Sequence, residues 1–593
     1  ANEIVLLSYY IAAINIEAVF DEINGPDHGY KPFEGIVLTD TFESTERQNT
    51  LDDDMFGEND KRLKKQQEVP ITAIISNPPY SVGQKNANDD NQNVHYLKLE
   101  EQIEKSYVKQ SHSKLSMSVY DSYIKAFRWA SDRIKNKGII GFITNNSFLD
   151  SNSTDGFRAS LYQEFNYLYV FNLRGAIRGK VGIGAKKEGQ NIFDILTGVS
   201  ISILVKDGSD KHEIFYHDIG DYISKKNKLD IIKNLFSIKN ISWNSLKPDQ
   251  NNDWLNKRDP NYQKYAPIAN DLNSPFFINA MGVKTNRDIW VSGFSREKVK
   301  CNSKKLIDNY NFEVTKSGGL GEKPTMRDPK KIKWSTNLER DFKRGIHLKF
   351  DPLNLSIQMY RPFTKKWLMY DKNIVERPGK YLNKWGKNNK VILSSGRGAN
   401  KDFSVFVSNC VPCMDLLEKT QGFMRFNNED NSDELIKVNK DNITDSFAKK
   451  IGLNKDDTFT YIYGLLNSKD FQGKYANDLK KDLARIPIVR NKEKYVEIGK
   501  NLMEIHLNYE EVPVYENVEI SYIGEPNYQV KKMKFAKKRS KNGKLEKDRS
   551  SIIFNDSITI STIPEKAYEY IVNGKSAIEW IMDQYQVKTD KKS

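Results

Sequence analysis

The sequence predicts an α/β domain that is followed by a mixed α+β domain. Over residues 1–208, short apolar runs alternate with stretches of helical periodicity, which is typical of a mostly parallel sheet with helices packed on it. From about residue 209 the pattern changes to short β-like pieces rich in Asn, Lys, Gly and aromatic residues, with turn signals between them. A chain of 593 residues also exceeds the roughly 100–200 residues of one ordinary domain.

Each element of the first domain follows from its own run of residues. Leu7, Ile11 and Ile14 recur at helical spacing and predict a helix near the start of the chain. Apolar runs predict strands at residues 35–39, 71–76, 139–144, 167–172 and 199–205. Helical periodicity predicts helices at residues 120–134 and 157–165.

The later part of the chain divides into two segments. Residues 209–515 form the expected second domain, and residues 516–593 form a C-terminal extension. A basic stretch at residues 531–547 predicts an exposed loop or arm. Helical patterns predict late helices at residues 479–483, 495–509 and 577–585. Because the chain opens inside an apolar segment, we expect it to be a piece of a longer polypeptide.

Composition favours a polyanionic partner and no membrane. Lys and Arg exceed Asp and Glu by 92 to 78, which gives a net charge of +14. Such an excess favours phosphate binding, because each neutralised phosphate releases condensed counterions, although many basic surfaces are only solvated. No apolar run approaches the roughly 20 residues that a membrane helix needs. We therefore expect a cytoplasmic protein, of bacterial origin given the resemblance described below.

The three cysteines are too few for a disulfide framework or a four-cysteine zinc site. Cys410 and Cys413 have CxxC spacing, but the seven histidines are scattered and offer no paired ligands. The expectation is that these cysteines, with Cys301, are ordinary packing thiols and that this chain holds no metal.

The strand expected at residues 71–76 ends in the tetrapeptide Asn77-Pro78-Pro79-Tyr80. The carboxyl ends of strands are where open parallel sheets bind ligands, so these residues are candidates for a catalytic site. The Asn77 side-chain oxygen and the Pro78 carbonyl form an acceptor pair suited to a poorly nucleophilic exocyclic amine such as that of adenine. Proline fixes φ and has no N–H, which leaves the carbonyl free and rigidly aimed.

Tyr80 supplies an aromatic face for the base, and stacking contributes about 1–3 kcal/mol per base. A base inside a duplex has to be flipped out to present its amine, which costs roughly a few kcal/mol. An Asn-Pro-Pro run after a strand can also be only a stiff turn, because short motifs recur by chance.

Several short sequence motifs on either side of Asn77 resemble motifs of the amino-methyltransferases that use S-adenosylmethionine. The opening run Ala1-Asn2-Glu3-Ile4 resembles the acidic motif that follows the family's second strand. This resemblance implies that Glu3 binds the ribose of the cofactor and that Ile4 packs on its adenine. The run Thr39-Asp40-Thr41-Phe42 resembles the family's motif after the next strand. This implies that Asp40 accepts a hydrogen bond from the amine of the cofactor's adenine and that Thr41 lies beside it.

The resemblance extends to a second aromatic position. Asn191-Ile192-Phe193 resembles the family's second aromatic motif. This resemblance implies that Phe193 stacks on the flipped adenine, on the face opposite Tyr80. The family's first strand and glycine-rich loop have no counterpart in this numbering. We therefore expect an N-terminally incomplete, Rossmann-like methyltransferase domain that by itself binds cofactor poorly.

Residues 4–17, 38–43, 483–487, 499–510 and 573–588 look more closely like the single-chain type ISP restriction-modification enzymes. That resemblance implies a γ-class N6-adenine methyltransferase domain at 1–208 and a target-recognition domain at 209–515, acting on double-stranded DNA. It also implies a nuclease and an ATP-driven, helicase-like translocase upstream in the parent polypeptide, where ATP and Mg²⁺ would bind.

Two regions offer candidate DNA contacts. Lys180, Lys186 and Lys187 lie in a glycine-rich basic loop that suits phosphate contact, although a merely solvated loop explains the pattern as well. In the second domain, basic residues interleaved with aromatics, and an arginine between glycines, suit DNA contact, although packing explains such aromatic runs better. These residues are Arg361, Lys365, Lys366 and Arg397.

Two other functions remain open at this point. Methyltransferases that act on RNA or on a protein glutamine can share the pattern at Asn77 to Tyr80, although a large basic second domain argues against a small protein substrate. The chain could also be a non-catalytic DNA-recognition module whose methyl pocket has decayed.

Overall fold

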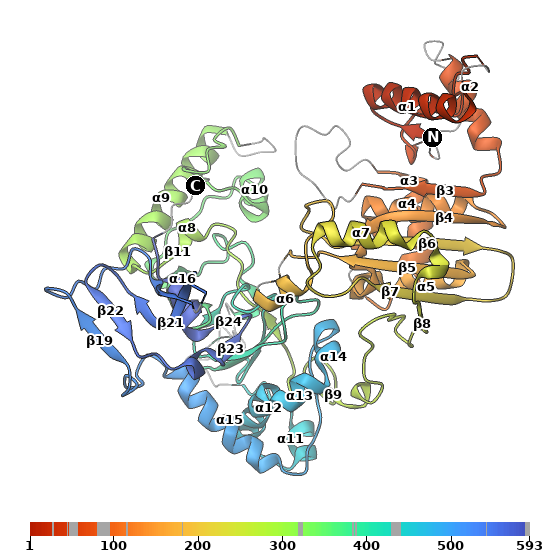
Figure 1. The fold of residues 1–593 in the computed structure, drawn as a ribbon. Helices are drawn as coiled ribbons and strands as arrows, with labels where there is room; N and C mark the ends of the chain where they lie inside the picture. The colour runs from red at the N-terminus through yellow and green to blue at the C-terminus, as the bar shows by residue number, and fades with distance from the viewer. Residues whose placement is uncertain are drawn as a thin grey trace. The chain divides into compact units, whose positions relative to one another are not determined.

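The computed structural model describes residues 1–25, 29–43, 46, 57–79, 95–113, 117–178, 180, 182–317, 324–381, 385, 388–428, 440–540 and 542–587. These residues fall into two compact units, which we call unit 1 (Ala1–Lys257) and unit 2 (Arg258–Ser593) (Figure 1). None of the helices formed by the described residues is long and apolar enough to span a membrane.

Unit 1 is built on a six-stranded sheet with the order β3-β4-β6-β5-β7-β8. Strands β3, β4, β5 and β7 run parallel to one another, whereas β6 is inserted antiparallel between β4 and β5. The strands span Ala73–Ser76 (β3), Gly138–Asn145 (β4), Tyr167–Arg174 (β5), Val199–Lys206 (β6), Glu213–Asp218 (β7) and Asn244–Leu246 (β8). The strands predicted at 71–76, 139–144, 167–172 and 199–205 are thereby confirmed.

Helices cover both faces of this sheet. On one face, Phe127 of α4 and Phe157 of α5 pack with Phe142 of β4. Helix α7 lies on the other face (Figure 1), and its Ile232 packs in the cluster that contains Phe171 of β5. The helices of unit 1 are α1 (Leu6–Asn24), α2 (Gly57–Glu68), α3 (Leu97–Ile103), α4 (Ser122–Arg133), α5 (Asp155–Glu164), α6 (Gly182–Lys187) and α7 (Lys225–Leu235).

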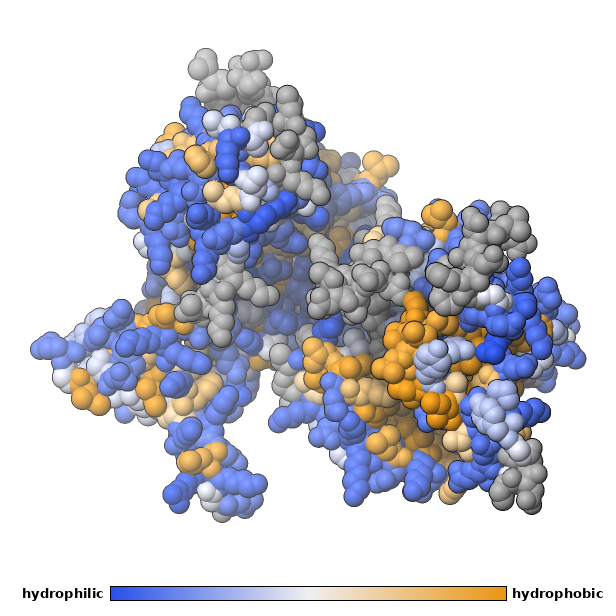
Figure 2. Space-filling view, turned by 90° about the horizontal axis from the view of Figure 1, so that it is seen from above, coloured by the Kyte–Doolittle hydropathy of each residue, from blue (hydrophilic) through white to orange (hydrophobic). Residues whose placement is uncertain are grey.

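The N-terminal layer forms a separate parallel pair, β1 (Asn2–Glu3) with β2 (Val37–Leu38). Helix α1 follows β1, and none of its side chains is buried. Leu7 is 69% exposed, Ile14 62% and Ile23 77%, although each has an apolar side chain. Figure 2 shows apolar side chains gathered on this part of the molecule. Such a continuous apolar face is unusual for the solvent-exposed surface of a protein.

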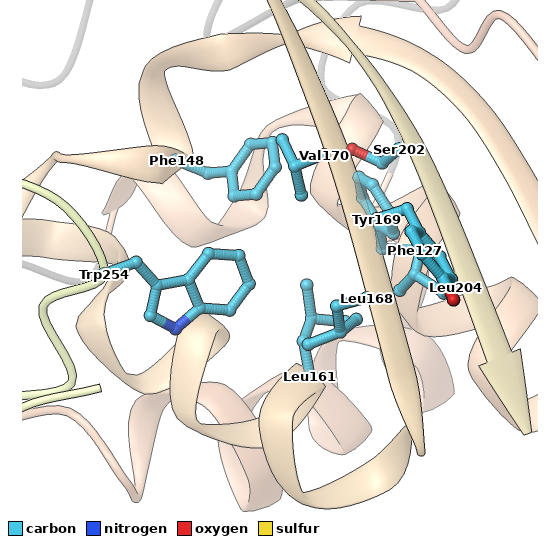
Figure 3. A pocket seen from close by; sticks show the side chains of 9 residues that line it. All are labelled: Phe127, Phe148, Leu161, Leu168, Tyr169, Val170, Ser202, Leu204 and Trp254. Carbon is cyan, nitrogen blue, oxygen red and sulfur yellow. The ribbon is translucent and has the colours of Figure 1, made fainter. Parts of the chain in front are cut away.

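Unit 1 continues past the border expected at residue 208. β7 and β8 extend its sheet, and Trp254 packs into its core beside Phe148, with ring centroids 6.3 Å apart. The fully buried Arg158 donates to the carbonyl of Asn252 at 2.7 Å and to the Asp253 carboxylate at 3.2 Å. The small cavity in Figure 3 is lined by Trp254 and by core side chains of the sheet and helices, so it is a packing space rather than a binding site.

Unit 2 contains two central four-stranded sheets, in the orders β10-β17-β14-β15 and β11-β13-β12-β16. The first comprises β10 (Ala280–Met281), β17 (Gln421–Met424), β14 (Val391–Ser394) and β15 (Val405–Ser408). The second comprises β11 (Ser292–Gly293), β13 (Thr364–Met369), β12 (Leu355–Arg361) and β16 (Val411–Pro412). Two further short pairs are β9 (Ala266–Pro267) with β18 (Arg485–Ile486), and β23 (Ile571–Val572) with β24 (Lys575–Ser576).

Helices complete two of the cores of unit 2, one around Tyr310 and Phe342 and the other around Phe459 and Ile462. They are α8 (Asp288–Val291), α9 (Arg296–Ser317), α10 (Thr336–Lys343), α11 (Asp445–Ile451), α12 (Lys455–Asn467), α13 (Lys469–Lys474), α14 (Ala476–Lys481), α15 (Lys492–Leu507) and α16 (Ala577–Gln584). The last three include the helices predicted from late helical patterns. The expected mixed α+β class of the second domain is confirmed.

The C-terminal extension carries its own antiparallel sheet, in the order β19-β22-β21-β20 (Figure 1). The basic stretch at 531–547, expected to be a loop or arm, instead supplies β20 (Lys534–Arg539) and the start of β21 (Leu545–Ile553). The reason is a row of apolar side chains across the sheet, because Phe535 pairs with Ile552, and Ile552 with Ile560. The other strands are β19 (Glu519–Tyr522) and β22 (Ile558–Ser561).

Candidate active site

Strand β3 delivers Asn77 and Pro78 to the carboxyl edge of the sheet. Its last residue, Ser76, pairs with Phe142 of the parallel strand β4. Pro78 is buried, whereas Asn77 and Pro79 are exposed at the surface. A buried proline fixes the backbone that precedes it, so the Asn77 side chain starts from a constrained position at the edge. Tyr80, the remaining residue of the predicted pocket, lies outside the described residues.

The loop that carries Phe193 ends at the same edge of the sheet. β6 begins at Val199, which pairs with Asn145 at the carboxyl end of β4. Only β4 separates β3 from β6, so the two strands lie about 10 Å apart. Phe193 is 42% exposed, while its neighbours Ile192 and Ile195 pack into the core. An aromatic ring is therefore presented to solvent by a loop with buried anchors.

Asn191 holds this loop against the end of β5. Its side-chain oxygen accepts the N–H of Phe193 at 2.9 Å, and its side-chain amide donates to the carbonyls of Thr197 at 2.7 Å and Gly175 at 3.2 Å. Gly175 has a φ of +87°, and a Cβ there would come within 2.9 Å of the Asn191 Cα. The close approach of the two segments therefore requires glycine.

We expect Asn191→Ala to lower the free energy of unfolding by about 1–2 kcal/mol, because several buried hydrogen bonds are lost together. Urea denaturation followed by circular dichroism measures this change. Leu196→Ala, in the same loop and on an exposed side chain, is the control. An Asn191→Ala effect no larger than that of Leu196→Ala would show that Asn191 does not hold the loop.

A polar network that the sequence does not predict lies beside this loop. The Asn146 side-chain amide donates to the side-chain oxygen of Asn172 at 2.8 Å, and Asn172 donates to the Tyr216 hydroxyl at 3.0 Å. Tyr216 donates to the Asp218 carboxylate at 3.0 Å, and Arg174 donates to the same carboxylate at 2.6 Å. Burial raises the pKa of Tyr216, so its hydroxyl keeps its proton and remains a donor. The one sequence signal is that polar residues end otherwise apolar strands.

The two acidic residues predicted to hold the cofactor lie at the carboxyl edge of the β1–β2 pair. Glu3 pairs with Leu38, and Asp40 follows two residues later. Oε1 of Glu3 accepts the N–H groups of Ile4 at 2.9 Å and Val5 at 3.0 Å. The Ile4 side chain is 48% exposed next to Glu3, and Thr41 is partly buried next to Asp40.

Asp40 is positioned by neighbours on both sides. Its Oδ1 accepts the N–H of Phe42 at 2.9 Å, and its Oδ2 accepts the hydroxyl of Tyr96 at 2.8 Å. The Tyr96 ring packs edge-on against Phe42, with centroids 5.4 Å apart. Burial, and secondarily the bond to Asp40, raises the pKa of Tyr96, so this hydroxyl stays protonated.

The predicted basic loop is in part a short helix, α6, which contains Lys186 and Lys187 with exposed side chains. Lys180 forms an ion pair with Glu188. Residues 179 and 181 lie outside the described residues.

The residues of unit 2 that the sequence offers as DNA contacts all interact with other side chains of the same unit. The Arg361 guanidinium lies 4.2 Å from the Tyr360 ring centroid and donates to the Cys413 sulfur at 3.3 Å. Lys365 pairs with Glu510 at 2.6 Å, and the Lys366 ammonium lies 3.7 Å from the same Tyr360 ring. Arg397, which is 53% exposed, pairs with Asp482 at 2.7 Å.

Among the described residues, no group of three or more His, Cys, Asp or Glu side chains is arranged to hold a metal ion. Cys413 is buried and receives the hydrogen bond from Arg361, and burial raises the pKa of its thiol.

The chain matches two known families. Residues 274–593 match the type ISP C-terminal specificity domain, and residues 4–176 match the Eco57I restriction-modification methylase. No curated protein matches the chain.

Three solved structures match over the whole chain. A nuclease-deletion mutant of the type ISP restriction-modification enzyme LlaGI, in complex with a DNA substrate mimic, is 49% identical with a TM-score of 0.89, covering 100% of this chain and 47% of its own. The ATP-dependent type ISP enzyme LlaBIII bound to DNA is 43% identical with a TM-score of 0.90, covering 100% and 40%. The DrdV–DNA complex is 27% identical with a TM-score of 0.85, covering 100% and 59%. This chain thus spans about half the length of these relatives.

Proposed function

Since this chain belongs to the type ISP restriction-modification family, as its methylase region and C-terminal specificity domain, we propose that it methylates adenine at N6 in duplex DNA. The methyl donor would be S-adenosylmethionine. The observation that carries the proposal is that Asn77 and Pro78 follow β3 at the sheet edge where the loop of Phe193 also ends.

The chemistry assigned to this edge is hydrogen-bond acceptance and base stacking. The target adenine leaves the duplex, and the Asn77 side-chain oxygen and the Pro78 carbonyl accept the two hydrogens of its amine. These two bonds favour a pyramidal nitrogen whose lone pair is available for attack. Phe193 covers one face of the base and Tyr80 the other. Because Asn191 fixes the loop, Phe193 loses little conformational freedom when the base arrives.

The residues at the β1–β2 edge fit the proposed cofactor. The ribose hydroxyls of S-adenosylmethionine are donors. Within the described part of the chain, both hydrogen bonds that Glu3 accepts go to Oε1, which leaves Oε2 to accept the hydroxyls. The exposed Ile4 offers an apolar surface for the adenine ring, and Asp40 offers acceptor oxygens to its amine. The cofactor, when bound, supplies the electrophilic methyl group.

We further propose that a segment of the longer parent polypeptide completes this cofactor site. In the described residues β1 pairs with β2 alone and β3 with β4 alone, so each offers an open edge. The apolar side chains of α1 lie exposed in the same unit. A further strand with a glycine-rich loop would pair with these edges and cover α1. The parent would also carry a nuclease and an ATP-dependent translocase.

The chain of 593 residues is therefore expected to bind S-adenosylmethionine at least about tenfold more weakly than the parent polypeptide, a difference of about 1.4 kcal/mol. Isothermal titration calorimetry of both proteins measures this difference. Equal affinities would show that residues 1–593 already form the whole site.

Base flipping tests the proposed function. The target position is first located by sequencing DNA from a host that expresses the parent polypeptide. A duplex with 2-aminopurine at that position should then gain fluorescence when the parent binds, because the extruded base leaves the stack. The same probe one base pair away is the control. Binding without any gain at the target position would favour a non-catalytic recognition module.

A further inference from the structure

The hairpin of β20 and β21 has cations opposite each other on one face. Lys537 pairs directly with Lys547, and Arg539 lies two residues along β20 on the same face. Directly opposed side chains in an antiparallel pair are about 5 Å apart, and like charges there are destabilising. All three side chains are exposed. We call these three residues the hairpin cation face.

On the opposite face of the same hairpin, positive and negative charges are paired. Lys538 pairs with Glu546 across the strands, and its ammonium lies 3.4 Å from the Asp548 carboxylate. Within the described residues, the ion pairs of these two strands involve Lys538 and Arg549 and none of the hairpin cation face. The unbalanced charge is therefore confined to one side of the ribbon.

Several other cations of unit 2 differ, because they form ion pairs. Lys365, Arg397 and Arg425 each pair with a carboxylate inside the unit. Edge lysines also protect a strand from unwanted pairing, but that role needs no two cations opposite each other on one face. At this level β21 pairs with β20 alone, because β22 joins only at Ile552 and Ile553. The hairpin is thus a two-stranded ribbon there.

We propose that the hairpin cation face binds the phosphate backbone of duplex DNA. The proposal rests on the DNA substrate of the proposed function and names a surface that contacts it. A two-stranded ribbon fits the major groove, which is about 12 Å wide, and Lys and Arg along one face can reach phosphates. A phosphate partner offsets the repulsion between Lys537 and Lys547.

The test measures how DNA binding by the chain depends on salt. Fluorescence anisotropy with a labelled duplex gives Kd between about 50 and 200 mM salt, and each phosphate contact contributes about 0.9 to the slope of log K against log salt. We expect Lys547→Gln to reduce the slope by about 0.9, and the triple variant K537Q/R539Q/K547Q by about 2.7. Lys538→Gln, on the opposite face, is the matched control and should leave the slope nearly unchanged.

Kd should change by the same factor for a duplex with the recognition site and for an unrelated duplex, because phosphate contacts carry no sequence information. A triple variant with the wild-type slope overturns the proposal, as does a loss confined to one sequence. The test is independent of catalysis, because Asn77→Ala should keep the wild-type slope, and the hairpin variants of the parent polypeptide should still methylate at saturating DNA.

Discussion

Replacing Asn77 by alanine in the parent polypeptide is expected to lower kcat for DNA methylation by about 10²–10³-fold or more, by analogy with the loss of one preorganised polar group in other enzymes. The reason is that the side-chain oxygen accepts a hydrogen bond from the amine in the reacting complex and does not contribute to binding of the duplex. The Kd for duplex DNA should therefore stay largely unchanged. Methyl transfer from radiolabelled S-adenosylmethionine and fluorescence anisotropy measure the two quantities.

Asn244→Ala is the matched control, because Asn244 is an exposed asparagine of the same sheet, at the start of β8. It should affect neither quantity. Equal losses of methylation and of DNA binding in Asn77→Ala would mean that Asn77 is a structural residue and not part of a catalytic pocket.

Replacing Phe193 by alanine is expected to lower kcat/KM for methylation by about 10- to 100-fold, because stacking on a base is worth about 1–3 kcal/mol. Phe193→Tyr keeps an aromatic face and should retain most of the activity. The gain of 2-aminopurine fluorescence should change in Phe193→Ala as well, since the flipped base loses one of its two covers.

Leu196→Ala is the control for this prediction, because Leu196 is 51% exposed in the same loop and has no ring. If Phe193→Ala and Leu196→Ala reduce kcat/KM equally, the loop acts as a whole and Phe193 has no stacking role of its own.

The sequence predicted the parts of unit 1 in which local pattern and tertiary structure agree. The run at 71–76 is apolar and is followed by two prolines, so both the strand and its end at Asn77 could be predicted. The Rossmann-like fold class, the type ISP family and the two-part organisation are confirmed. The roles of Asn77, Tyr80 and Phe193 remain predictions.

Long-range packing explains what the sequence did not reveal. The end of unit 1 at Lys257 depends on Trp254 and Asp253 reaching a core formed about 100 residues earlier by Phe148 and Arg158, which no local signal indicates. The network of Asn172, Tyr216 and Asp218 arises only when β5 and β7 become neighbours.

The sequence predicts an arm at 531–547 because the many charged residues mask the strand pattern there. Phe535 and Ile552 are the apolar pair that joins β20 to β21, and they lie 17 residues apart with lysines between them. Alternation of apolar and polar residues, the usual sign of a half-buried strand, is therefore weak in both strands. The same lysines are what make the hairpin a candidate DNA contact.

The identity of the methylated nucleoside tests the account most directly. The parent polypeptide would be incubated with duplex DNA and deuterium-labelled S-adenosylmethionine, and the digested nucleosides would be resolved by mass spectrometry. The account predicts label in N6-methyl-2′-deoxyadenosine, and at least about 10²-fold slower labelling when Asn77 is alanine. Label in a methylated cytosine, in RNA or in protein, or undiminished label with Asn77→Ala, would contradict it.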